Sequence, residues 1–294
     1  MARSTIFLYL VILVVWSTSW LPLSWQVEAV APEIAVFWRF VLAAPLMWLF
    51  AWHQKARLRV ALNQQIWFAG LGLCLFSANF TLFYYGSLGV ASGLLAVVFS
   101  TASLINLGLD ALRTRTAPRP LLVLAALVGA LGVGLLYWPE IQLGQAAMFS
   151  LLACLAGTLF FCSGNMVSAE LQRRSVSVLT ANCWGMAWGV VWLSLFGLSQ
   201  GQDFTPPTSL AWLAGLVWLA VFASVVAFST YLTLVGRIGP GRAGYATVVF
   251  PVFALFLSAL FEGYDWSWLT VLGVGLVAAG NIVMLRSGRQ AAMR

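Results

Sequence analysis

Long apolar segments separated by short polar turns run through the whole of this sequence. Each segment is about as long as the roughly 20 residues that an α-helix needs to cross a lipid bilayer. The pattern predicts ten transmembrane helices, at about residues 4–24, 33–52, 65–86, 90–110, 119–138, 146–168, 177–198, 209–235, 243–261 and 266–285. The longest polar stretch, residues 200–209, is only a loop. We therefore expect an all-α membrane protein without a soluble domain.

A stretch of the first half of the chain returns about 150 residues later. Residues 80–101 read FTLFYYGSLGVASGLLAVVFST, and residues 230–251 read TYLTLVGRIGPGRAGYATVVFP. Each copy is the end of one apolar segment, a glycine turn and the start of the next segment. Repeats of this kind in a membrane protein predict two related halves with a site between them. We place these halves at residues 1–140 and 141–294.

The charged residues fall in the turns, and their order supports ten spans. Turns with arginine or lysine alternate along the chain with turns that are acidic or uncharged. With ten spans, fourteen of the fifteen Lys and Arg residues lie on one side of the membrane. Because basic residues are enriched in cytoplasmic loops, we expect both termini in the cytoplasm. Five helices per half is an odd number, so the second half should be inverted relative to the first.

The composition agrees with this picture and excludes several classes of function. Hydrophobic residues make up 62% of the 294 residues and charged residues 8%, with mean hydropathy +0.95, whereas soluble domains carry about 25% charge. The basic turns account for the net charge of +7, so no nucleic-acid partner is expected. The cysteines form no CxxC pair, and the single histidine, His53, lies in a turn. We expect no metal, no cofactor and no enzymatic activity.

Arg39 is the only basic residue outside the basic turns, about two helical turns into the second predicted span. It can bind a carboxylate of a ligand. The alternative, which the sequence favours, is that the side chain extends outward and pairs with Glu33 or rests on Trp38. No acidic residue falls near the middle of a predicted span, although proton-coupled transporters commonly use one as a relay.

Uncharged polar residues recur along several predicted helices at helical spacing. Asn79 lies in the third segment, Asn165 in the sixth and Tyr231 in the eighth. Such residues can line a watered cavity, or they can form hydrogen bonds between helices worth about 0.6 kcal/mol each. The second interpretation is favoured for any single residue. Polar stripes on helices from both halves nevertheless favour a cavity at the interface of the halves.

Two residues predict breaks near the middle of the membrane. Pro251 removes a backbone hydrogen bond and should kink the ninth helix, and Thr101 stands at the matching place in the first half. Thr101 can loosen its helix by donating to a carbonyl one turn back. A freed carbonyl can bind an ammonium group, or the break can act as a hinge. The other expected hinges are the repeated turn glycines Gly86, Gly89, Gly236 and Gly239.

Aromatic residues make up 14% of the chain, and many lie near the predicted membrane surfaces. Trp184, Trp188 and Trp192 form a stripe on one face of the seventh predicted helix. Packing in the core or against lipid is the favoured interpretation of this stripe. The alternative is that Trp188 forms a wall for a flat, apolar ligand.

Together these features resemble the EamA branch of the drug/metabolite transporter superfamily. The resemblance rests on the ten spans in two halves, on Trp16-Ser17 and on four short motifs: FWRF at 37–40, LGVA at 88–91, GPGRA at 239–243 and FPVF at 250–253. It covers nearly the whole chain and is specific for the fold rather than for a substrate. Thr101 stands where the family usually has a proline, so the first half is expected to hinge less.

The resemblance implies export across the bacterial inner membrane by alternating access through a cavity between the halves. It also implies a pocket formed by the third, fourth, sixth and ninth helices. This pocket would have Asn79, Phe99, Thr101 and Phe161 at its wall. Within the superfamily, the sequence is most similar to exporters of aromatic amino acids from Gram-negative bacteria. The expected substrate is an amino acid, its side chain against aromatic rings and its charged groups near Asn79 and Asn165.

Two other functions stay open from the sequence. One is a multidrug or other-metabolite exporter of the same fold, and the other is a membrane scaffold or receptor that transports nothing. Since no mid-membrane acid is present, we expect a facilitator driven by the gradient of its own substrate. The expected partners are a small molecule and the lipid bilayer, and the protein is expected to be a monomer.

Overall fold

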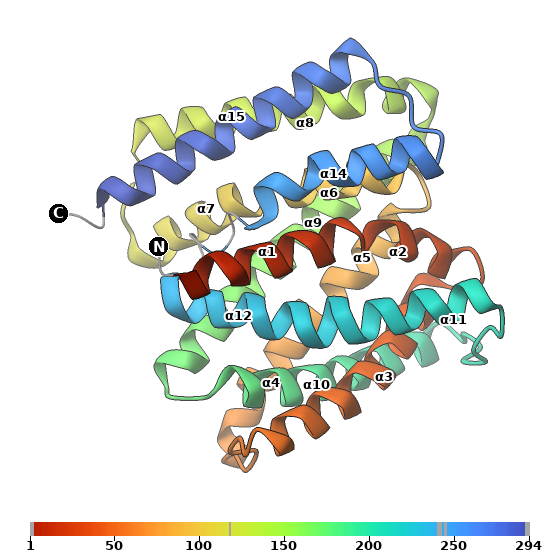
Figure 1. Ribbon diagram of the computed structural model, residues 1–294, viewed down its shortest axis with the longest axis vertical. Coiled ribbons are helices and arrows are strands. Elements are labelled where there is room, and N and C mark those ends of the chain that lie inside the picture. Colours follow the sequence, from red (N-terminus) through yellow and green to blue (C-terminus); the bar gives the residue numbers. More distant parts are fainter. Residues whose placement is uncertain (1–2, 118, 240–242, 244–245, 292–294) are drawn as a thin grey trace.

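The fold is known from a computed structural model, which describes residues 3–117, 119–239, 243 and 246–291. All regular structure among these residues is helical, as the sequence predicts, and most of the helices run along one common direction (Figure 1). The α-helices are α1 (Arg3–Ser17), α2 (Trp20–Val27), α3 (Pro32–His53), α4 (Gln65–Leu73), α5 (Asn79–Gly86), α6 (Ser92–Phe99), α7 (Ala102–Thr114), α8 (Pro120–Leu143), α9 (Gln145–Arg173), α10 (Val178–Ser199), α11 (Leu210–Val217), α12 (Ala227–Ile238), α14 (Ala246–Phe261) and α15 (Trp268–Ala291).

Short helical pieces join end to end into membrane-length segments. Among the described residues, eight segments are long and apolar enough to span a membrane. They are Thr5–Val27, Pro32–His53, Leu62–Gly86, Ser92–Arg113, Pro120–Gln142, Gln145–Arg173, Val178–Ser199 and Leu210–Ile238. These coincide with the first eight predicted spans. The last two predicted spans fall on α14 and α15, whose described apolar parts, Pro251–Phe261 and Trp268–Val283, are shorter, so the count of ten stays a prediction.

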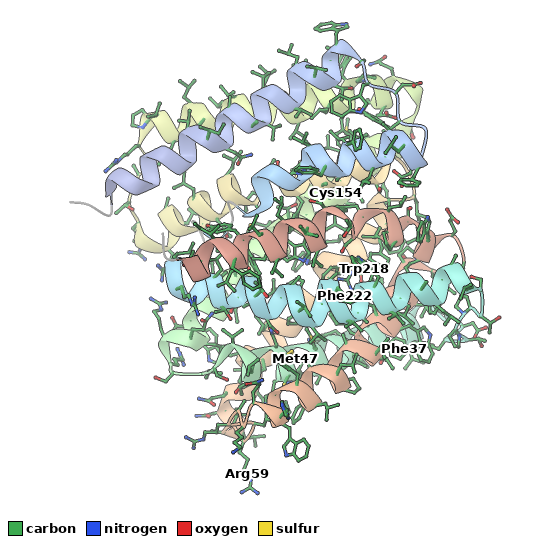
Figure 2. All side chains as sticks on the ribbon, viewed as in Figure 1. Phe37, Met47, Arg59, Cys154, Trp218 and Phe222 are labelled. Atoms are coloured by element: carbon green, nitrogen blue, oxygen red, sulfur yellow. The ribbon has the colours of Figure 1, made fainter. Side chains whose placement is uncertain are left out.

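The two ends of the helix bundle differ in charge. The start of α1 and the ends of α12 and α15 lie on the left of Figure 1, and the start of α3 and the end of α14 lie on the right. We call the left side the basic end, where α12 has Arg237 in its last turn; Arg59, in the loop after α3, extends away from the bundle at the bottom of Figure 2. We call the right side the acidic end, where Glu33 begins α3 and Glu262 follows α14.

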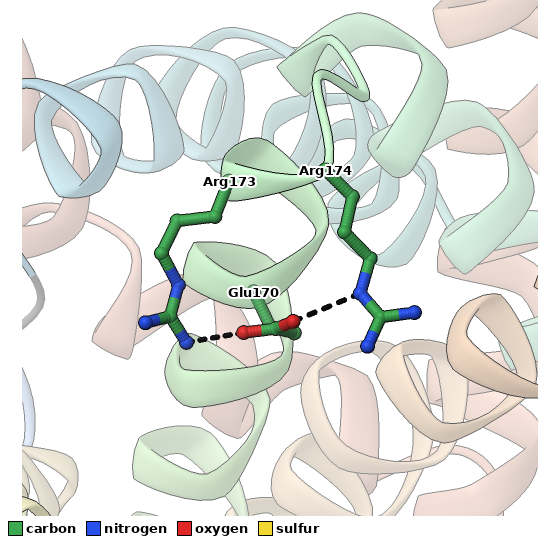
Figure 3. Close-up of polar contacts among 3 residues, drawn as sticks. All are labelled: Glu170, Arg173 and Arg174. Atoms are coloured by element: carbon green, nitrogen blue, oxygen red, sulfur yellow. Dashed lines mark hydrogen bonds and ion pairs between the residues drawn. The ribbon is translucent and has the colours of Figure 1, made fainter.

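A cluster of ion pairs lies at the C-terminal end of α9, at the basic end of the bundle. Glu170 accepts hydrogen bonds from Arg173 and from Arg174, the latter at 2.8 Å between Nε and Oε1 (Figure 3). The guanidinium of Arg174 also lies 4.4 Å from the ring centre of Trp67. Because both arginines are largely exposed to solvent, these pairs contribute little to stability.

Helices α8 and α15 lie side by side at the edge of the bundle (Figure 1) and approach closely because glycines line their contact. A Cβ atom on Gly132 would lie 2.6 Å from the carbonyl oxygen of Gly273, and one on Gly280 would lie 2.6 Å from that of Ala125. Small residues at such positions let helix backbones pack in contact inside a membrane.

A group of hydrogen bonds, which we call the α6–α14 latch, joins α6 to α14 at the acidic end. The Glu262 carboxylate accepts from the backbone N–H of Ser92 at 2.9 Å and from its hydroxyl at 3.0 Å. The backbone N–H of Gly93 donates to the Ser258 hydroxyl at 2.8 Å. Both N–H groups belong to the first turn of α6, which has no acceptors of its own. The latch therefore completes the start of α6 with acceptors from the far end of the sequence.

The predicted break at Thr101 is confirmed. Helix α6 ends at Phe99 and α7 begins at Ala102, and the Thr101 hydroxyl donates to the carbonyl of Val98 at 2.6 Å. At Pro251, by contrast, the predicted interruption is not observed, because α14 continues through this residue. The kink and the hinge role expected of Pro251 stay predictions.

Three of the four predicted hinge glycines lie at tight packing contacts. A Cβ on Gly86 would lie 2.6 Å from the Cys154 sulfur, and one on Gly89 would lie 2.6 Å from the Ala146 carbonyl. A Cβ on Gly236 would collide with the Gln172 amide. Gly239 differs, because it ends α12 with φ +82 and has open space around it. The hinge role of all four glycines stays a prediction.

Gly132→Ala should destabilise the protein by about 1–3 kcal/mol, because the added methyl group must push α8 away from α15. The matched control is Gly134→Ala on the exposed side of α8, where no atom lies within 4 Å of the added Cβ. This control should be neutral or stabilising, since alanine favours helix formation. Unfolding in detergent micelles, followed by size-exclusion chromatography, measures both; equal effects would contradict the tight α8–α15 contact.

Glu262→Ala should destabilise the protein by about 1–3 kcal/mol, because it leaves the two Ser92 donors of the latch without their acceptor. Glu28→Ala, which removes an exposed carboxylate at the same end, is the matched control and should have little effect. The same unfolding measurement applies. If the two variants unfold alike, the α6–α14 contact does not depend on the carboxylate.

Candidate functional site

A cavity lies inside the bundle, between α1, α2, α3, α5, α6, α9 and α12. It contains about 470 Å³ of space that is not filled by protein atoms, open solvent included. Seven of its thirteen lining residues are aromatic, three are aliphatic and three are polar. The lining consists of Trp16, Ser19, Trp20, Leu23, Arg39, Asn79, Phe80, Phe83, Phe99, Phe161, Leu219, Ala223 and Phe228.

Trp16 lines the cavity and is the centre of a group of aromatic contacts. Its indole packs on Tyr231 at 5.0 Å, Phe228 at 5.5 Å, Phe99 at 6.0 Å and Phe161 at 6.1 Å between ring centres. These rings come from α6, α9 and α12, so one side chain of α1 joins helices that are far apart in the sequence. We call these five residues the aromatic floor.

The wall above this floor is also built from rings in edge contact. Trp20 lies one helical turn beyond Trp16 and contacts Phe83 at 5.5 Å and Phe99 at 6.0 Å. Phe99 contacts Phe83 at 5.4 Å and Phe161 at 4.6 Å. Phe99 is the last residue of α6, so its ring lies directly before the break at Ser100 and Thr101. Edge-to-face packing of this kind is a preferred arrangement of aromatic side chains.

Arg39 brings one positive charge into the cavity. Its side chain is only 2% exposed, and its Nε donates to the Ser224 hydroxyl at 2.9 Å. Its Nη1 donates to the Tyr84 hydroxyl at 3.4 Å, and its Cζ lies 4.1 Å from the ring centre of Phe80. No carboxylate among the described residues lies within 4.0 Å of this guanidinium.

The expectation that Arg39 extends outward to Glu33 is therefore wrong. The Glu33 carboxylate instead accepts a hydrogen bond from Tyr85 at 2.7 Å, because α5 brings that hydroxyl to the start of α3. Arg39 lies about two turns further along α3, where Ser224 and Tyr84 face it from the bundle interior. Three neutral contacts hold this charge away from lipid, and none of them neutralises it.

Two π-helical segments border the cavity. They are η2 (Cys74–Ala78), directly before α5, and η3 (Trp218–Val226), between α11 and α12. In η3, the Ser224 hydroxyl donates to the Leu219 carbonyl five residues back while it accepts from Arg39. Wide helical turns of this kind often occur at functional sites. The sequence analysis missed both segments, since no residue type distinguishes them from the surrounding apolar helix.

Asn79, which begins α5 directly after η2, supplies an acceptor in the cavity. Its amide nitrogen donates to the Leu75 carbonyl at 3.3 Å, which leaves the Oδ1 atom pointing elsewhere. That oxygen is buried and has no hydrogen-bond partner among the described residues. A buried acceptor without a donor is unfavourable, so this atom is a natural position for an N–H or O–H group of a ligand.

The structure brings some of the predicted site residues together and separates others. Asn79, Phe99 and Phe161 line the cavity. Tyr231 is part of the aromatic floor, and its hydroxyl accepts from the Asn165 amide at 3.0 Å on the side away from the cavity. The predicted residues outside the lining are Thr101, Asn165, Trp188, Tyr231 and Pro251.

Trp188 has a structural contact instead of a place at the cavity. Its indole N–H donates to the Gln65 side chain at 2.8 Å, and the stripe continues with Trp184 donating to Leu58 and Trp192 to Ala69. The three bonds fasten α10 to α4 and to the loop before it. The favoured packing interpretation of this stripe is therefore correct.

The sequence analysis did not identify several lining residues, including Trp20, Phe80, Phe83 and Phe228. One signal was present: Trp16, Trp20 and Leu23 follow the helical spacing of a single inward face. No comparable signal exists for Phe228, because aromatic residues occur on all faces of these helices. In the part of the lining that the structure describes, the site combines flat apolar walls with one positive charge and contains no carboxylate.

Comparisons with known proteins agree with a transporter. A profile of the EamA-like transporter family matches residues 3–138 and 148–286. Protein PagO of Salmonella typhimurium (strain LT2) is 24% identical, over 90% of this chain and 87% of its own. The "uncharacterized inner membrane transporter YedA" of Escherichia coli (strain K12) is also 24% identical, over 92% and 87%.

Two further similarities extend over nearly the whole chain. The "probable amino-acid metabolite efflux pump" of Escherichia coli (strain K12) is 24% identical over 97% of both chains. A crystal structure with 17% identity superposes with a TM-score of 0.70, over 98% of this chain and 99% of the other, which establishes a shared fold. Since the family profile covers most of the sequence and agrees with the membrane-length helices, this chain is a multi-pass membrane transporter of the EamA-like transporter family.

Proposed function

We propose that the protein exports amino acids, with a preference for aromatic ones, by alternating access through the cavity. The observation that carries this proposal is the buried guanidinium of Arg39, which lines the cavity without a carboxylate partner among the described residues. A buried, unpaired charge is costly, and a substrate carboxylate would relieve that cost. Arginine suits this role because its planar donors match the geometry of a carboxylate.

The other two parts of an aromatic amino acid have matching groups in the cavity. The unpartnered Oδ1 of Asn79 can accept a hydrogen bond from the ammonium group. The rings of Trp20, Phe83 and Phe99 can contact the aromatic side chain, and such contacts contribute about 0.5–1.5 kcal/mol each beyond the burial of area. An amino-acid substrate also agrees with the printed name of the efflux-pump relative.

Alternating access requires that the cavity can be closed on either side. We infer that the aromatic floor closes it toward the basic end, and the α6–α14 latch joins the helices at the acidic end. We propose that η2, η3, the break at Thr101 and the turn at Gly239 are the places where helices bend during the cycle. These positions already depart from regular α-helix, so small backbone changes there move the adjoining segments.

The arrangement in the membrane follows from the sequence repeat and the charged ends. We propose ten spans in two inverted halves, residues 1–140 and 141–294, with the basic end in the cytoplasm. The position in the bacterial inner membrane is supported by the printed name of the YedA relative. The alternatives are a multidrug exporter, which the positive charge of Arg39 disfavours for cationic drugs, and a scaffold, which would carry no flux.

Labelled phenylalanine should enter proteoliposomes by counterflow against unlabelled phenylalanine, and Arg39→Gln should reduce this exchange at least about tenfold because the carboxylate loses its charged partner. Asn79→Ala should also reduce it. The matched control is Arg59→Gln, which removes an exposed arginine at the basic end and should keep full exchange. An absence of exchange by the unchanged protein, or full exchange by Arg39→Gln, would refute the proposed site.

A pH gradient alone should not drive accumulation of phenylalanine in proteoliposomes, since the described residues of the cavity lining include no carboxylate that could carry a proton. An imposed phenylalanine gradient should drive flux at the same rate with and without a protonophore. Robust uptake that follows the pH gradient would show proton coupling and would overturn the facilitator mechanism.

A further inference from the structure

The charge balance of the cavity favours a ligand with a net negative charge over a zwitterion. Among the described residues, the lining carries the positive charge of Arg39 and no carboxylate. A zwitterion binds with no net charge, so the occupied cavity stays positive. A ligand with a single negative charge makes the occupied cavity neutral, and in an apolar environment a neutral arrangement is favoured over an unbalanced buried charge.

The acceptors of the cavity set a second condition. An ammonium group has three donors to satisfy. Among the described lining residues, the side-chain acceptors are the unpartnered Oδ1 of Asn79 and the Ser19 hydroxyl, which donates to the Val15 carbonyl at 2.5 Å and keeps its lone pairs. Two acceptors satisfy a ligand with a single hydroxyl donor, whereas they leave one donor of an ammonium group without an acceptor.

From these two conditions we propose that the cavity also takes aromatic 2-hydroxy carboxylates, at least as readily as aromatic amino acids. Such a molecule has a carboxylate for Arg39, one hydroxyl that donates to the Oδ1 of Asn79, and a ring for the aromatic walls. It carries a net charge of −1 and therefore neutralises the site. This inference rests on the proposed function, because it assumes that the same cavity is the substrate site.

The test compares three solutes that share one aromatic side chain and differ in charge. Proteoliposomes containing the full-length protein are loaded with 3-phenyllactate, phenylalanine or phenethylamine, and the entry of labelled phenylalanine is followed. Phenyllactate should stimulate entry at least as strongly as phenylalanine, and phenethylamine should stimulate it at least about tenfold less, because its cation is repelled by Arg39. Protein-free liposomes correct for phenyllactate that crosses the bilayer unaided.

A second measurement uses the charge that each solute carries through a facilitator. A potassium diffusion potential is set across the membrane with valinomycin. It should speed or slow the entry of labelled phenyllactate, depending on the sign of the potential, because each molecule carries a net charge of −1. The entry of labelled phenylalanine, which has no net charge, should not respond. In Arg39→Gln, the advantage of phenyllactate over phenethylamine should fall at least about tenfold. Arg59→Gln, with its exposed side chain, should retain it. The comparison of solutes on the unchanged protein holds even if a variant fails to fold.

The possible outcomes separate this inference from the proposed function. Exchange of phenylalanine without exchange of phenyllactate would overturn the inference and leave the amino-acid exporter standing. If neither phenyllactate nor phenylalanine supports exchange, both the inference and the proposed function are overturned. Stronger exchange with phenethylamine than with the two acids would also overturn both, because it would show that the cavity prefers cations.

Discussion

The burial of Arg39 is the constraint on which the centre of this protein depends. A guanidinium in the membrane interior needs neutral donors and acceptors around it, a partner charge, or both. The fold supplies Tyr84 from α5, Ser224 from η3 and the face of Phe80, and among the described residues it supplies no partner charge. Under the proposed function, the carboxylate of the substrate supplies the opposite charge, which would link the energetics of the fold to the choice of substrate.

Hydrogen bonding of the backbone explains where the helices are irregular. Inside a membrane every N–H and C=O group must find a partner within the protein, so lipid-facing segments stay regular. The departures occur next to the cavity, at η2, at η3 and at Ser100–Thr101. At the last of these, the Ser100 and Thr101 hydroxyls donate at 2.6 Å to the carbonyls of Val97 and Val98, which also accept from the backbone N–H groups of Ser100 and Thr101. Local hydrogen bonds therefore hold the backbone at this break.

Different kinds of contact join the helices at the two ends of the bundle. Toward the basic end, Trp16 brings together rings from α6, α9 and α12 without directional bonds. Toward the acidic end, the latch uses hydrogen bonds between Glu262 and the start of α6. Contacts between rings can slide past one another at low cost, whereas a set of hydrogen bonds is either made or broken. The contacts at the two ends therefore differ in kind, with ring packing at the basic end and hydrogen bonds at the acidic end.

The sequence by itself determined the membrane class, the all-α fold, the order of charged turns and the break at Thr101. These follow from local properties: the length of an apolar run, the charge of a turn, and the reach of a hydroxyl one turn back. Only the tertiary structure decided that Arg39 turns inward, that Trp188 fastens α10 to α4, and that α14 continues through Pro251. Each of these depends on partners distant in the sequence or on how a helix packs, and periodicity carries no information about which helix faces which. The cavity depended most on tertiary contacts, because seven of its thirteen lining residues are aromatic and aromatic residues occur all along this chain.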